Sequence, residues 1–205
     1  MILVIIIIIV TGIISFLGFS SEKIFNAFSL QPYMIVKRFQ IYRNLTHGLL
    51  HGSWSHLIIN MLVFYSFGSL IVEIFCEIWD NSGYFLFILL YFSAIIVSSI
   101  FSTIKHRNNP YYVAIGASGA TSAIIFCSIL FAPWNKIYFF GIIPIPAIFF
   151  GGIYLIYCFI MGRRGKDNIG HDAHFWGAIY GFLFPLIFKP SIISYFFSQL
   201  LTIKF

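Results

Sequence analysis

Residues 171–181 read HDAHFWGAIYG, and the fold can be worked out from this stretch. His174, Gly177 and Gly181 stand at i, i+3 and i+7, so they share one face of a helix. Small residues on such a face let a second membrane helix approach closely. The stretch therefore predicts a helix that meets a neighbour along its glycines, with His174 at the same interface.

A matching surface occurs in the segment GASGA at residues 116–120. If the glycine face packs on this segment, His174 comes next to Ser118 although the two lie far apart in the chain. Small residues around Ser118 allow that approach. They are Gly116, Gly119, Ala120 and Ala123.

The composition excludes an ordinary soluble domain. Of the 205 residues, 60% are hydrophobic and 9% are charged, whereas soluble domains carry about 25% charged residues. A bilayer span needs about 20 apolar residues, and it must be helical because lipid cannot satisfy free backbone groups. We predict an all-α polytopic membrane protein, a single domain over residues 1–205. Its six expected spans are 2–20, 54–76, 83–104, 112–132, 137–161 and 172–189.

Charge and cysteine content narrow the possible partners. The net charge of +6 comes from Lys and Arg in loops beside helix ends, where a membrane surface explains them without nucleic acid. The three cysteines, Cys76, Cys127 and Cys158, lie in or at the ends of apolar spans and match no metal-ligand spacing. We interpret them as packing residues and expect no metal.

Polar residues inside spans are costly and mark functional sites. They cluster at the starts of the second, fourth and sixth spans: HGSWSHLIIN at 51–60, Ser118, and His171 to His174. Even-numbered spans cross in the same direction, so we expect these three clusters at one membrane face. Within the first cluster, His56 and Asn60 are four residues apart and share a helix face.

These residue types favour acyl transfer. A serine hydroxyl becomes a nucleophile when a base accepts its proton, and a neutral imidazole suits that task. Ser118 and His174 supply the pair. Asp172 lies about 200° around the helix from His174, so we expect a dyad without a carboxylate. His56, Asn60 and the Ser118 N–H are the expected donors to the oxyanion, and this chemistry needs no cofactor.

From about Tyr42 to Gly181, the chain resembles the rhomboid intramembrane serine proteases. HGSWSHLIINM resembles their motif of His, four residues, His, three residues and Asn. GASGA resembles their nucleophile motif, and AHFWGAIYG fits Ala-His-x-x-Gly-x-x-x-Gly. The resemblance implies a serine endopeptidase that cleaves single-span membrane proteins, with a six-helix core, as a multi-pass protein of a bacterial inner membrane.

The resemblance also implies residue roles. Ser118 corresponds to the nucleophile, His174 to the general base, and Gly116 to the nucleophile turn. His56 and Asn60 correspond to groups on the oxyanion side. The positions with a structural role near the site are Arg43 (with Tyr42, in the first loop), His51, Gly119, Gly177 and Gly181.

The resemblance further implies a lateral path for substrates between the second and fifth helices, with loop 162–170 as a cap. The fifth span is the least regular one, which fits either a gate or a simple kink. Four residues make it so: Pro144, Pro146, Gly151 and Gly152.

Two positions depart from the family pattern. Ser122 stands where some members have a tyrosine that stacks on the catalytic histidine. Glu73 follows Gly68 by five residues where four is commoner, so its usual role at the end of the second helix is in question.

Two indications of the membrane orientation disagree, namely the distribution of Lys and Arg and the orientation usual in the family. Loops 21–53, 105–111 and 162–170 hold nine Lys and Arg residues against three on the opposite side, a count that places the site in the cytoplasm. The family usually opens its site to the extracytoplasmic side. We adopt the family orientation because such counts apply least to long loops.

Two other functions stay open. An inactive rhomboid-like protein would bind membrane clients without cutting them, and such members typically lack the Ser or the His that this chain has. A metal or haem protein would instead use histidines, two of which stand at i, i+4. These candidates are His47, His51, His56, His171 and His174.

Overall fold

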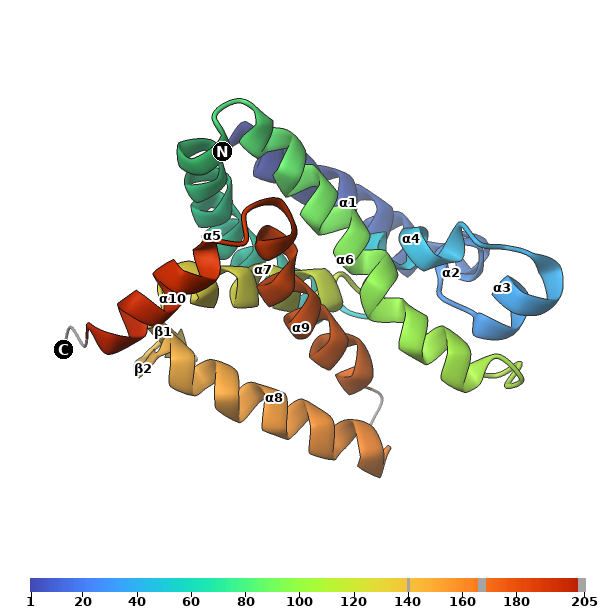
Figure 1. Ribbon diagram of the computed structural model, residues 1–205. Coiled ribbons are helices and arrows are strands. Elements are labelled where there is room, and N and C mark those ends of the chain that lie inside the picture. The colour runs from blue at the N-terminus through green and yellow to red at the C-terminus, as the bar shows by residue number, and fades with distance from the viewer. Residues whose placement is uncertain (140, 166–168, 203–205) are drawn as a thin grey trace.

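The computed structural model of the protein describes residues 1–139, 141–165 and 169–202. Figure 1 shows them as a bundle of helices. The long helices are α1 (Ile2–Ser20), α5 (Trp54–Trp79), α6 (Ser82–His106), α7 (Ser118–Phe131), α8 (Ala147–Arg164) and α9 (His171–Phe188), followed by α10 (Ile192–Leu201). The predicted all-α membrane fold is confirmed.

The helices differ in how far they can cross a membrane. Helices α1, α5, α6 and α8 are long and apolar enough to span it, and α9 with α10 passes the same test as one span bent by 119°. The 14 residues of α7 cover about 21 Å, which is less than the ~30 Å of bilayer hydrocarbon. The prediction of a full helical span over 112–132 is therefore wrong, because residues 112–117 are not helical.

Helix α7 lies in the middle of the bundle (Figure 1), where it contacts α5, α6, α8, α9 and α10. Every residue from Gly119 to Phe131 except Ile125 is buried. A helix that is apolar on all sides is stable only when other helices surround it. The fold therefore places the first turn of α7, with Ser118, inside the protein rather than at its surface.

Helices α7 and α9 pack backbone against backbone. A Cβ atom added at Gly177 would collide with the carbonyl group of Gly119, and one added at Gly181 would collide with the carbonyl group of Ala123. Gly177 and Gly181 stand one turn apart, so the close approach continues along the helix. The predicted contact between the glycine face and the strip of small residues is confirmed.

Residues 21–53 form a region of short helices beside α1 and α6 (Figure 1), namely α2 (Glu22–Phe28), α3 (Pro32–Arg38), α4 (Arg43–Thr46) and the 3₁₀ helix η1 (His47–Leu49). Arg43 is buried at its centre. Nη1 of Arg43 donates to the carbonyl oxygens of Asn26 and Ser29, at 2.6 and 2.8 Å. Its Nε donates to Gln40 Oε1 at 2.7 Å. Arg43 thereby ties α4 to the end of α2.

The same region holds the extended segment that precedes α7. Leu30 and Ala114 exchange two backbone hydrogen bonds, of 2.9 and 3.0 Å. The Gly116 N–H donates to the His47 carbonyl oxygen at 2.9 Å. Backbone groups outside a helix need such partners where water is scarce. Residues 112–117 are thus fixed without being helical, and the helix begins at Ser118.

The fifth predicted span begins later than expected. Strands β1 (Lys136–Phe139) and β2 (Ile143–Pro146) form an antiparallel hairpin, and α8 starts at Ala147 rather than at residue 137. Pro144 and Pro146 account for the difference, because proline lacks a backbone N–H and breaks a helix interior.

The proposed cap 162–170 differs from the expectation in part. Its residues 162–164 complete α8, and residues 166–168 lie outside the described part of the chain. After α9 the chain turns back sharply into α10 (Figure 1).

The α7–α9 contact predicts how one methyl group added at Gly181 changes the stability of the protein. We expect Gly181→Ala to lower the free energy of unfolding by about 1–3 kcal/mol, because overpacking pushes the two backbones apart. Gly152→Ala on α8 is the matched control, since its added Cβ would meet nothing within 4 Å and alanine favours the helix. Thermal unfolding in detergent micelles measures both variants. Equal midpoints for the two would contradict the packing argument.

Candidate active site

Ser118 and His174 meet at the starts of α7 and α9. The Oγ atom of Ser118 lies 2.7 Å from Nε2 of His174, and both side chains are partly buried. Asp172 is engaged elsewhere, in an ion pair of 2.7 Å with Lys105 of α6. The structure thus brings together the two residues that the glycine spacing predicted, and it directs Asp172 away from them.

Gly116 forms the turn into α7. Its φ angle is +116°, a conformation that residues with side chains rarely adopt. A Cβ atom at this position would lie 3.2 Å from His56 Nε2 and 3.8 Å from Ser118 Oγ. The space beside Gly116 therefore faces both the His56 ring and the Ser118 hydroxyl, and a side chain there would fill it.

His56 is supported by His51. Their rings meet edge to face with centroids 4.9 Å apart. Nδ1 of His51 lies 3.0 Å from Ser15 Oγ on α1, and this hydroxyl donates its own hydrogen to the Leu49 carbonyl oxygen at 2.9 Å. The His51 Nδ1 must then be the donor to Ser15. Helix α1 thereby fixes the His51 ring against which His56 rests.

Asn60 lies one turn further along α5 and is buried. Its Nδ2 donates to the His56 carbonyl oxygen at 3.1 Å. An amide nitrogen carries two hydrogens, so this bond uses one of them. The structure therefore brings His56 to the space beside Gly116 and holds Asn60 behind it, bonded to its own helix.

Sequence reasoning missed Tyr154 of α8. Its ring stacks on His174, with centroids 6.3 Å apart and planes 22° apart. Its hydroxyl lies 2.7 Å from the Ser122 Oγ atom. Ser122 occupies the position at which the resemblance led us to consider a stacking tyrosine. Here the small serine leaves room for a ring that comes from another helix.

Four of the five histidines considered as metal ligands fall into two groups. His47 and His51 bond within the protein, because His47 Nδ1 lies 3.0 Å from the Arg43 carbonyl oxygen and His51 bonds to Ser15. His171 and His174 instead lie near Cys158 of α8. One ligand atom from each of these three residues lies within 4.8 Å of the other two, an arrangement that can hold a metal ion.

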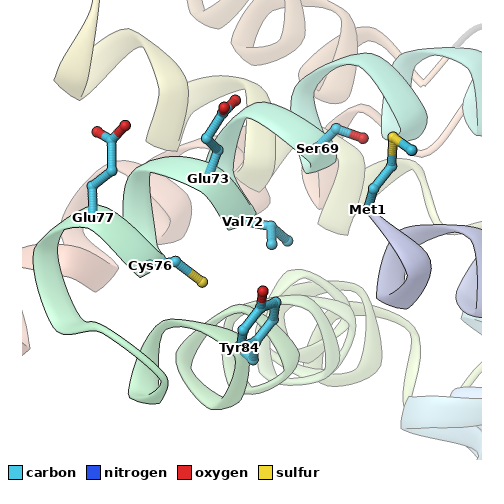
Figure 2. Close-up of a pocket in the computed structure, with 7 residues that line it drawn as sticks. All are labelled: Met1, Ser69, Val72, Glu73, Cys76, Glu77 and Tyr84. Atoms are coloured by element: carbon cyan, nitrogen blue, oxygen red, sulfur yellow. The ribbon is translucent and has the colours of Figure 1, made fainter.

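A separate hollow of about 510 Å³ lies at the far end of α5. Figure 2 shows Glu73 and Glu77 on one side of this helix and Tyr84 across from it on α6. Glu73 is 17 residues along α5 from His56, which corresponds to about 25 Å. The hollow contains no histidine among its lining residues, and Glu73 is exposed. It is therefore distinct from the Ser118 site.

The arrangement around Ser118 suits attack on a carbonyl carbon. A hydroxyl bonded to an imidazole can give up its proton as it attacks. The first N–H groups of α7 lack partners within their helix and carry its positive dipole end, so they favour developing negative charge nearby. The His56 ring borders the space beside Gly116, and it can donate there in the tautomer that carries its hydrogen on Nε2.

Comparisons with known proteins agree with these features. The chain matches the Rhomboid domain family over residues 38–191, a range that includes Ser118 and His174. It is also similar to RHOMBOID-like protein 12, mitochondrial, from Arabidopsis thaliana, with 28% identity over 177 residues. That alignment covers 76% of this chain and 50% of the relative. The chain thus spans about half the length of that protein.

Two buried histidines outside the spans, His47 and His51, predict how the free energy of unfolding depends on pH. Burial lowers the pKa of His47 to about 4 and that of His51 to about 3, whereas the unfolded chain binds a proton near pH 6.5. The unfolded state therefore takes up more protons as the pH falls below ~6.5, and stability is lost. Each histidine contributes up to about 1.4 kcal/mol per pH unit to this loss.

We expect His51→Asn to reduce the slope of unfolding free energy against pH by up to that amount between about pH 6 and pH 5. Denaturation in micelles at several pH values measures it. Tyr195, exposed on α10, offers the control variant Tyr195→Phe, which should leave the slope unchanged. An unchanged slope in His51→Asn would contradict the assignment of a neutral, buried imidazole.

Proposed function

The chain belongs to the rhomboid family and is a multi-pass integral membrane protein, and from this premise we propose that it is an intramembrane serine endopeptidase. The single observation that carries the proposal is the 2.7 Å contact between Ser118 Oγ and His174 Nε2. The contact joins the first residues of α7 to the first turn of α9. The alternative without function was a Ser118 hydroxyl that bonds to a carbonyl oxygen of its own helix.

The proposed reaction proceeds in two stages. Ser118 attacks the carbonyl carbon of a peptide bond while His174 accepts the hydroxyl proton and then passes it to the leaving amine. Water next attacks the resulting acyl-serine, and His174 takes its proton in turn. The acyl group leaves as a carboxylic acid, and Ser118 regains its hydrogen. A dyad suffices because Tyr154 holds the histidine ring that a carboxylate would otherwise orient.

The oxyanion of each tetrahedral intermediate would occupy the space beside Gly116. We propose the Ser118 N–H and the His56 ring as donors to that space. Asn60 becomes a third donor if its second amide hydrogen turns toward the oxyanion. One such donor is worth roughly 100- to 1,000-fold in rate. Because donors are fixed before substrate binds, little reorganisation is needed when the charge develops.

We propose that the substrates are single-span membrane proteins that enter between α5 and α8. Helix α8 supports this path, because only Ala147, Gly151 and Cys158 of its 18 residues are buried. It can therefore move aside with little loss of packing. A bacterial inner membrane stays a prediction from the sequence, and the mitochondrial name of the plant relative applies to that protein.

The proposed mechanism predicts that Ser118→Ala lowers cleavage of a single-span reporter by at least about a thousandfold, because the nucleophile is lost. Ser128→Ala on the same helix is the matched control, since among the described residues its hydroxyl bonds to the Ile125 carbonyl oxygen alone. A fluorophosphonate probe should label the wild type at Ser118. A wild type that neither cleaves nor reacts would instead identify an inactive, client-binding relative.

Tyr154 is proposed as a positioning residue for His174. Tyr154→Phe keeps the ring and should retain most activity. Tyr154→Leu loses the stacking, which is worth about 0.5–1.5 kcal/mol, so we expect kcat to fall up to roughly tenfold. KM should stay unchanged, because the ring orients the base and does not bind substrate. A loss that phenylalanine fails to rescue, or a change confined to KM, would contradict this role.

A further inference from the structure

Cys158, His171 and His174 form a cluster between α8 and α9. Figure 1 shows the C-terminal part of α8 beside the first turns of α9. One ligand atom from each residue lies within 4.8 Å of the other two. Cys158 is 1% exposed and His171 is 3% exposed. Because His171 and His174 stand three residues apart on α9, both rings can face the same point.

The chemistry of these three side chains selects a particular class of ion. One thiol and two imidazoles, with no carboxylate among them, suit zinc better than calcium or magnesium, which prefer oxygen ligands. Zn–S and Zn–N bonds of about 2.3 and 2.0 Å place the donor atoms of a tetrahedral site some 3.3–3.6 Å apart. The ligand atoms lie up to 4.8 Å apart, so the cluster would have to contract by up to about 1.2–1.5 Å. Side-chain rotation and a small shift of the lightly packed α8 can supply this.

We propose that Cys158, His171 and His174 bind one Zn²⁺ ion and that this binding switches the dyad off. Cys158 loses its thiol proton to solvent as the Zn–S bond forms, and a water molecule completes the tetrahedron. A neutral imidazole has a single lone pair. If the metal takes that lone pair on either nitrogen of His174, the ring can no longer accept the Ser118 proton.

This switch differs from a resident metal cofactor. The metal would bind the general base and support no step of the reaction, and it would also hold α8 against α9. Binding of the metal to His174 would block the general base. Holding α8 against α9 would close the path by which substrates enter. The metal site stands on its own geometry, whereas its inhibitory effect rests on the proposed protease function.

The metal site is tested with purified protein in micelles, using Co²⁺ as a spectroscopic substitute for Zn²⁺. We expect a thiolate-to-cobalt charge-transfer band in the wild type, which added Zn²⁺ abolishes. Cys158→Ser should lose the band, because serine is a poor zinc ligand. The serine hydroxyl can still replace the Cys158 thiol in its hydrogen bond with the Tyr154 side chain. Cys127→Ser, at a buried cysteine of α7, is the matched control and should keep it. No band in the wild type, or a band that survives in Cys158→Ser, would overturn the site.

The inhibition is tested in the reporter assay with and without Zn²⁺. Zinc should inhibit the wild type and Cys127→Ser reversibly on chelation. For Cys158→Ser, the inhibitory zinc concentration should rise at least about tenfold, since loss of a metal-supporting group costs that much affinity or more. Equal inhibition of all three would overturn the switch. A wild type that binds cobalt but never cleaves would reject the proposed protease while leaving the metal site intact.

Discussion

Direct contact between the backbones of α7 and α9 is the constraint on which the rest of the structure depends. Lipid is as apolar as the helices, so close packing rather than water exclusion brings membrane helices together. Gly177 and Gly181 permit that packing because they have no side chain, and the carbonyl groups of Gly119 and Ala123 occupy the space. The distance between Ser118 and His174 follows from this contact.

A second constraint explains why Ser118 lies at a helix start inside the protein. Residues 112–117 are not helical, and their backbone groups need partners that lipid does not offer. Leu30 and His47 provide them, and Arg43 holds the region from which they come. The region before α5 therefore fixes the position of Ser118, although none of its atoms takes part in the proposed reaction.

The sequence predicted what local periodicity and composition encode. The membrane class follows from composition, whereas the glycine face of α9 and the separation of Asp172 from His174 follow from spacing along one helix. The contacts of Tyr154 with Ser122 and His174 were not predicted, because residues on different helices share no periodic pattern. The proximity of Cys158 to His171 and His174 was not predicted for the same reason. The late start of α8 was predictable in principle, since Pro144 and Pro146 oppose a helix.

The origin of the Tyr154 ring has a consequence for how such proteins diverge. The space beside the His174 ring is filled once, by Tyr154 of α8, and a second aromatic residue at position 122 would compete for it. We therefore expect a large residue at position 122 or 154 to be accompanied by a small residue at the other. Substitutions at these two positions should then be correlated among homologues, because either position can supply the ring beside His174.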